Sequence, residues 1–207
     1  MIHDQTKSLL IEIARELFAK QGFRGTTIRA ITERAGTNLG AVTYHFGSKL
    51  ALYHEVVERA TQPMREHLRG LDLERTSALE AIGLVIRGMF GFLAKNPDVP
   101  SLVMQQLMTS DPLPPAAKNT IGMALGSMTA LIERGQQDGS IRSGPPRYMA
   151  VSFALIPMAQ AIYRRSLREA AGIDNTDPAV RAAIEHQVIT LIRRGLAAAP
   201  APDGEAS

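Results

Sequence analysis

Apolar side chains recur along this chain at the three- and four-residue spacing that is typical of amphipathic helices. In the first such segment, residues 4–21, one face carries Leu10, Ile13, Ala14, Leu17 and Phe18. The spacing returns in later segments, at residues 27–35, 39–45, 48–70, 78–95, 101–109, 116–137, 148–170 and 178–198. No segment shows the strict alternation of apolar and polar residues that marks a half-buried strand. The pattern therefore predicts an all-α fold of about nine helices.

Residues 26–49 contain two short helical patterns that are separated by a tight turn. Thr27 can cap the first helix, because its hydroxyl can accept a hydrogen bond from a backbone N–H of the first turn. Gly36 follows the last apolar position of that helix, where a left-handed residue commonly ends a helix. The second helix, residues 39–45, stops shortly before another potential cap, Ser48. A helix, a turn and a short helix form the helix-turn-helix pattern, whose second helix enters the major groove of DNA.

The distribution of charge agrees with this interpretation. Residues 20–49 contain five basic side chains and one acidic one, a local charge of 5 − 1 = +4, whereas the whole chain carries +3. Beyond residue 60 the count is 15 basic to 14 acidic side chains. The positive excess is therefore concentrated where the helix-turn-helix pattern lies, as a surface that faces phosphates requires.

Composition narrows the remaining classes of function. The chain has no cysteine, which excludes disulfides, thiolate catalysis and cysteine-ligated zinc. We find no catalytic Ser-His-Asp order, glycine-rich phosphate loop or metal-ligand spacing, so we expect no enzyme activity, no metal and no cofactor. The N-terminus lacks an apolar signal core, and the uncharged run at residues 148–163 is shorter than the ~20 residues of a membrane span. These features predict a soluble cytoplasmic protein without membrane partners.

Several motif positions in the first quarter of the chain match a known family in register. They are the run Gly25-Thr-Thr-Ile-Arg-Ala-Ile, the pair Ala35-Gly36, and the run Tyr44-His-Phe-Gly-Ser-Lys49 with Leu52. Over roughly residues 5–55 the chain resembles the DNA-binding domain of the TetR-type transcriptional regulators. It departs from the usual pattern at Thr32, Thr37 and Thr43.

The resemblance implies an architecture and a set of partners. A three-helix helix-turn-helix head, residues 1–55, is expected to be joined by a long helix to a C-terminal helical domain, residues 56–198, that binds an effector and dimerises. The Pro/Ala-rich tail, residues 199–207, is predicted to be disordered. The partners implied are a second copy of the chain, a double-stranded DNA operator with two-fold-related half-sites, and a small-molecule effector.

The resemblance also nominates DNA-binding residues. Val42 and Phe46 lie four residues apart and are expected to hold the head together, so their neighbours on the second helix should face outward. With the family's turn and phosphate positions added, the candidates are Thr27, Leu39, Gly40, Thr43, Tyr44, His45 and Lys49. For His45 the alternative is a side chain hydrogen-bonded inside the head. For Tyr44 the alternative is a partly buried ring.

Methionine and aromatic residues in the C-terminal part suggest an effector pocket. Methionine adapts its shape, so it fills irregular cores and also lines binding pockets. The candidate lining residues are Met89, Phe90, Phe92, Leu93, Met104, Leu107, Met108, Met123, Phe153 and Tyr163. No charged cluster stands out among them, which predicts a largely apolar effector. The alternative for each residue is ordinary core packing.

The last two helical segments are candidates for the dimer interface. Residues 148–163 are apolar on nearly all sides, and such a helix must be buried on more than one side. The candidate interface residues are Val151, Leu155, Val180, Ile184, Val188, Leu191 and Ile192. The alternative is packing within one chain. Pro157 lies inside this segment and cannot donate to the carbonyl of Phe153, so the helix should bend or break there.

Taken together, the sequence predicts a homodimeric, sequence-specific DNA-binding regulator, most simply a repressor that a small effector releases from its operator. Two other functions remain open at this stage. One is an enzyme or ligand carrier with a vestigial DNA-binding head, which turnover of the effector would indicate. The other is a DNA-binding protein without sequence preference, which a steep salt dependence on every sequence would indicate.

Overall fold

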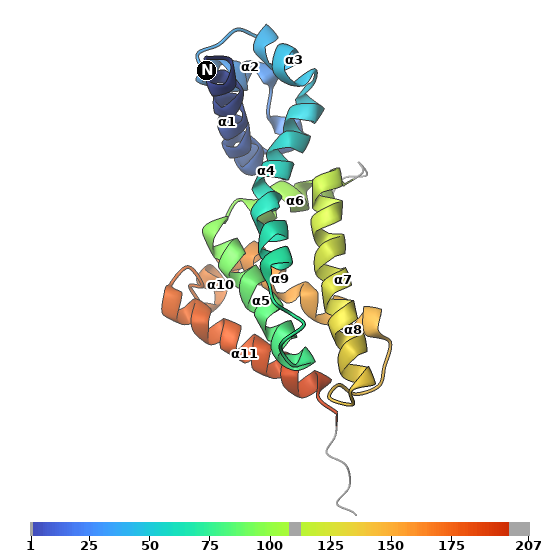
Figure 1. Cartoon of the computed structure of the whole chain (residues 1–207). Helices are drawn as coiled ribbons and strands as arrows, with labels where there is room; N and C mark the ends of the chain where they lie inside the picture. Colours follow the sequence, from blue (N-terminus) through green and yellow to red (C-terminus); the bar gives the residue numbers. More distant parts are fainter. Residues whose placement is uncertain (1, 108–112, 199–207) are drawn as a thin grey trace, which may run out of the picture. The chain divides into compact units, whose positions relative to one another are not determined.

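The computed structural model describes residues 2–107 and 113–198, and these residues form helices joined by short connections (Figure 1). In chain order the helices are α1 (Ile2–Gly25), α2 (Ile28–Arg34), α3 (Gly40–Phe46), α4 (Lys49–Gly70), α5 (Ala78–Lys95), α6 (Val99–Leu107), α7 (Pro115–Gln137), α8 (Pro146–Ala154), α9 (Ile156–Ile162), α10 (Arg164–Ala171) and α11 (Pro178–Leu196). Over this part of the chain, the only extended pairing is an isolated antiparallel bridge between Ile141 and Ala197. The all-α prediction is confirmed. The expected tail, residues 199–207, lies outside the described residues.

The contacts between residues divide the chain into two compact units. The first unit comprises the described residues of Met1–Glu66 and Lys95–Ile121, so it contains α1, α2, α3, most of α4, α6 and the start of α7. The three helices of the helix-turn-helix head therefore share a compact unit with α6, which follows them by some fifty residues along the chain. The domain boundary that the sequence suggested after residue 55 stays a prediction.

Polar contacts attach the segment before α6 to α1. The guanidinium of Arg15 donates two hydrogen bonds to the carboxylate of Asp98, at 2.5 and 2.9 Å. Burial alone would raise the pKa of Asp98, but the hydrogen bonds and charge of Arg15, together with the backbone N–H groups of Asp98 and Val99, outweigh burial and hold that pKa below its ordinary value. This ion pair therefore stabilises the first unit at neutral pH, and its contribution falls when Asp98 is protonated in acid.

A buried tyrosine makes the second attachment between α6 and the head. The Tyr53 hydroxyl of α4 donates a 2.5 Å hydrogen bond to the carbonyl of Leu102 in α6. The Tyr53 ring packs edge-on against Phe18 and beside Phe23, with 5.1 Å between ring centroids in both cases. Burial raises the pKa of Tyr53 to about 12. The aromatic cluster at the centre of the head thus also fixes α6.

The second unit comprises the described residues of His67–Ala94 and Gly122–Ser207. The largest of its fully buried side chains come from α5, α7 and α11: Ile82, Ile86, Met128, Ile132, Ile192 and Leu196. At one point α7 passes very close to its neighbours, because a Cβ on Gly135 would lie 2.5 Å from the side chain of Ile141 and 2.9 Å from that of Ala78. Glycine is needed there by the packing itself.

The segment expected as one helix over residues 148–170 is broken into α8, α9 and α10. The first break lies between Ala154 and Ile156, and Pro157 stands in the first turn of α9, where its missing N–H costs no helical hydrogen bond. The prediction that Pro157 bends or breaks this helix is confirmed. A second break at Tyr163 was not predicted, because neither glycine nor proline marks it in the sequence.

Candidate DNA-binding interface

Local hydrogen bonds set the ends of the helix-turn-helix. Thr27 is extended (φ −104°, ψ 152°), and its hydroxyl accepts a hydrogen bond from the Ala30 N–H at 3.1 Å. Gly36 follows the end of α2 with φ +65°. The Ser48 hydroxyl accepts from the Ala51 N–H at 3.0 Å and caps α4. The three boundaries predicted from the sequence are confirmed, and they fix where α3 begins and ends relative to its neighbours.

The short helix α3 has one buried side and one exposed side. Ala41 and Val42 are 8% and 0% exposed, so they hold α3 against the rest of the first unit. Gly40, Thr43 and Tyr44 are exposed, and their spacing of three and four residues places them on a shared face. Tyr44 is 71% exposed, so the alternative of a partly buried ring is not what the structure contains. Leu39, directly before α3, is also exposed, at 59%.

His45 lies at the border between these two sides. Its ring is half-buried, with the Tyr44 ring 5.1 Å away and the Phe46 ring 6.0 Å away, measured between centroids. Phe46 itself is only half-buried, and the Lys7 ammonium lies 5.8 Å from its ring centroid. His45 can therefore contact DNA only at the edge of the exposed surface.

Lys49 has a position that the sequence did not predict. Its ammonium donates hydrogen bonds to the backbone carbonyls of Phe23 and Thr26, both at 2.9 Å, and lies 4.4 Å from the centroid of the Phe23 ring. Burial lowers the pKa of this ammonium. Lys49 thus closes the turn between α1 and α2, next to Thr27. An ammonium has three N–H donors, and two of them are used here, so one is left for a phosphate.

Ion pairs within the head involve Arg29 and Arg34, which are among the basic residues counted in this region. Arg29 pairs with Glu33 one turn along α2, at 2.7 Å, and Arg34 pairs with Glu16 of α1. Both pairs are exposed, and exposed pairs of this kind stabilise a fold only slightly. Part of the local positive charge is therefore compensated by neighbouring carboxylates.

The candidate effector residues do not all belong to one unit. Met89, Phe90, Phe92, Leu93, Met123, Phe153 and Tyr163 belong to the second unit, whereas Met104 belongs to the first. Phe90 and Leu93 are buried, but Tyr163 is 60% exposed, so the single chain does not enclose it. The side chain of Leu107 and all of Met108 lie outside the described residues. These assignments stay predictions.

The candidate dimer residues divide into two groups. Val151, Leu155 and Leu191 are 44%, 56% and 63% exposed, so they are available to a partner. Val180 and Ile184 are half-buried. Val188 and Ile192, by contrast, are 9% and 1% exposed, so they pack inside the chain and are not available to a second copy. Ile184, Val188 and Leu191 stand at i, i+4 and i+7, so the helical period alone does not separate the exposed Leu191 from the buried Val188.

The described residues contain no group of three potential metal ligands, and none of their helices is both long and apolar enough to cross a membrane.

Comparison with known proteins places this arrangement in a family. Residues 10–56 match the model for "Bacterial regulatory proteins, tetR family", and residues 79–192 match that for "Tetracyclin repressor-like, C-terminal domain". The HTH-type transcriptional repressor NicS of Pseudomonas putida is 23% identical over 201 residues, which cover 93% of each chain. The HTH-type transcriptional repressor KstR2 of Mycobacterium tuberculosis is 33% identical over 86 residues, covering 34% of this chain and 42% of KstR2.

Solved structures agree in fold. A bacterial regulatory protein in the tetR family from Rhodococcus RHA1 superposes with a TM-score of 0.78 at 17% identity, covering 94% of this chain and 98% of the other. The structure of KstR2 superposes with a TM-score of 0.74 at 17% identity, covering 93% and 95% of the two chains. The two family models together cover the head and most of the second unit. The chain belongs to the tetR family of bacterial regulatory proteins and is a DNA-binding transcriptional regulator.

Proposed function

We propose that this protein is a homodimeric repressor that places α3 of each subunit in the major groove of two-fold-related operator half-sites. The observation that supports this most directly is the exposed side of α3, where Gly40, Thr43 and Tyr44 lie opposite the buried Val42. A hydroxyl and a methyl group at residue 43 and a phenol at residue 44 can read base edges. Thr27 and Lys49, at the α1–α2 turn and the start of α4, are suited to contact phosphates.

Two substitutions at Tyr44 test this assignment of base contacts. Tyr44→Ala should weaken binding to an operator selected by the wild-type protein by about fivefold to 150-fold, since a good base contact contributes about 1–3 kcal/mol. The dependence of affinity on salt should change little, because no phosphate contact is removed. Tyr44→Phe separates the hydroxyl from the ring. Leu9→Ala, which shortens an exposed apolar side chain on α1, is the control. Equal affinities for Tyr44→Ala and the wild type would contradict the proposal.

The second part of the proposal is an effector that is small and largely apolar and binds in the second unit. Its candidate neighbours there are thioether, aromatic and aliphatic side chains without charge: Met89, Phe90, Leu93, Met123 and Phe153. The effector must bind the operator-bound and released forms with different affinity, because otherwise it shifts no equilibrium. A panel of hydrocarbon-rich compounds should include one that raises the unfolding temperature and also dissociates the operator complex. If only strongly hydrophilic, charged compounds did so, the apolar pocket would be the wrong assignment.

A further inference from the structure

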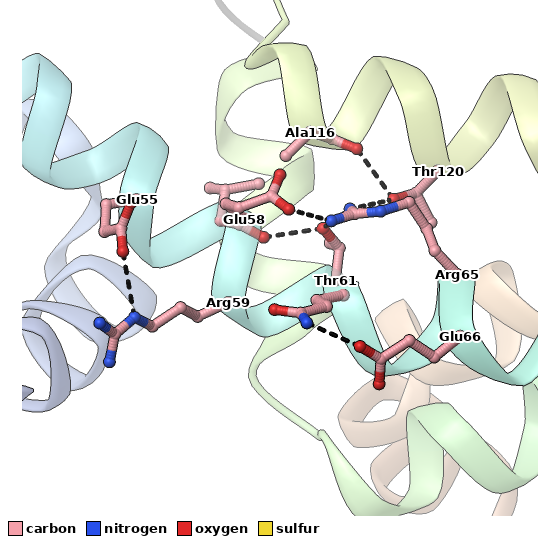
Figure 2. Close-up of polar contacts among 10 residues, drawn as sticks. Glu55, Glu58, Arg59, Thr61, Arg65, Glu66, Ala116 and Thr120 are labelled. Carbon is pink, nitrogen blue, oxygen red and sulfur yellow. Dashed lines mark hydrogen bonds and ion pairs between the residues drawn. The ribbon is translucent and has the colours of Figure 1, made fainter.

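A buried arginine, Arg65, lies in the C-terminal part of α4. Among the described residues, Arg65 is the only charged residue whose exposure is as low as 7%. Its guanidinium donates to the hydroxyl of Thr61 at 2.9 Å and to the hydroxyl of Thr120 on α7 at 3.0 Å, and it forms an ion pair with Glu58. Figure 2 shows Arg65 reaching from α4 to Thr120, with Glu58 and Thr61 beside it. We refer to Glu58, Thr61, Arg65 and Thr120 as the Arg65 network.

Each hydroxyl of the Arg65 network is itself held in place. Thr61 donates to the carbonyl of Val57 at 2.8 Å, and Thr120 donates to the carbonyl of Ala116 at 2.8 Å. Both hydroxyls therefore present their oxygens to Arg65 as acceptors. Well-packed apolar residues often stabilise a fold as much as a buried charge with its partners does, so stability alone does not account for an arginine at this buried position. The geometry fixed here is the distance and register between α4 and α7.

The Arg65 network lies near the residues at which α4 and α7 leave the first unit. Pro63 lies inside α4 and has no N–H to donate to the carbonyl of Arg59, so the helix is weakest there. The first unit ends at Glu66 on α4 and at Ile121 on α7, directly after Arg65 and Thr120. The network thus joins the two helices at the last point before both continue into the second unit.

We infer that Arg65 is a positioning residue for DNA binding, and that its bond to Thr120 holds α4, the helix that follows α3, in one register against α7 within the first unit. This inference rests on the proposed function. A single helix with a proline in it can bend and twist, whereas two helices tied together at their exit cannot do so independently. A dimer that reads two half-sites must orient two such units at once. Restricting them beforehand lowers the entropy lost on binding an operator of the correct spacing.

The test uses the full-length dimer and two DNA duplexes. One is the operator that the wild-type protein selects from a random pool, and the other is the same operator with one base pair inserted between the half-sites. Thr120→Val removes the hydroxyl at nearly constant volume, and Thr120→Ser is the matched control that keeps it. We expect Thr120→Val to bind the selected operator about tenfold more weakly, equivalent to about 1.4 kcal/mol. Its affinity for the inserted duplex should change much less, so its preference for spacing falls.

Two further readouts separate positioning from simple loss of stability. The dependence of affinity on salt should be the same for Thr120→Val, Thr120→Ser and the wild type, because the network touches no phosphate. Glu58→Gln removes the ion pair at a partly exposed side chain and should reduce the spacing preference in the same direction. If both variants unfold at lower temperature but keep the wild-type preference for spacing, the Arg65 network is only structural and the inference is overturned. If the wild-type protein selects no operator at all, the proposed function fails first, and the inference falls with it.

Discussion

Replacing Lys49 by methionine removes the ammonium group while nearly preserving the length of the side chain. In the structure this ammonium makes two hydrogen bonds of 2.9 Å to backbone carbonyls and lies over the ring of Phe23. Hydrogen bonds to charged groups contribute about 1.5–3 kcal/mol each when buried. Lys49 is only half-buried, so we expect solvent to replace part of this and the free energy of unfolding to fall by about 2 kcal/mol. For a chain of this size the unfolding temperature should fall by about 4–8 °C.

The same substitution has a separate effect on DNA binding. If the remaining N–H of each Lys49 contacts a phosphate, a dimer loses two contacts, and the magnitude of the slope of log affinity against log salt should fall by about 1.8. Calorimetry gives the unfolding temperature, and operator titrations at several salt concentrations give the slope. Lys118→Met, which removes an exposed lysine from α7, is the control for loss of charge alone. An unchanged slope would remove Lys49 from the phosphate-binding surface, and an unchanged unfolding temperature would refute the carbonyl contacts.

Three further predictions concern stability and assembly. A tyrosine in the unfolded chain releases its proton near pH 10, whereas buried Tyr53 does so only near pH 12. The difference in free energy of unfolding between the wild type and Tyr53→Phe should therefore shrink as the pH rises from 10 to 12, which urea titrations would measure. Gly135→Ala should lower the free energy of unfolding by about 1–3 kcal/mol through overpacking, whereas Gly126→Ala on the same helix, where a Cβ meets nothing within 4 Å, should raise it slightly. Leu191→Asp should yield monomers in sedimentation velocity, whereas Leu9→Asp should remain a dimer; a dimeric Leu191→Asp would place the interface elsewhere.

The sequence predicted the parts of the fold that depend on neighbouring residues. The cap at Thr27, the left-handed Gly36 and the cap at Ser48 each depend on hydrogen bonds or backbone angles within a few positions, and all three are confirmed. The break near Pro157 follows from a missing N–H, which is a property of one residue. In the same way, the spacing around Val42 predicted which side of α3 is exposed.

Contacts between distant residues could not be predicted in this way. Lys49 bonds to carbonyls more than twenty positions away, and Arg65 bonds to a hydroxyl 55 positions away. The residues around Lys49 and Arg65 in the sequence carry no pattern that indicates these distant acceptors. On α11 the apolar residues extend around more than one face, so their period predicted a helix but did not separate Leu191, which is exposed, from Val188, which is buried. That distinction depends on what the rest of the chain covers.

In the proposed complex, two copies of α3 read a specific, two-fold-related DNA sequence. Sequencing of the fragments that the purified protein selects from a random pool of duplexes tests this. We expect enrichment of an inverted repeat, with half-sites whose spacing allows both α3 helices to enter major grooves on one face of the DNA. We also expect Tyr44→Ala to lose discrimination at particular bases within each half-site. A pool without any enriched motif, bound with the same steep salt dependence on every sequence, would contradict this proposal.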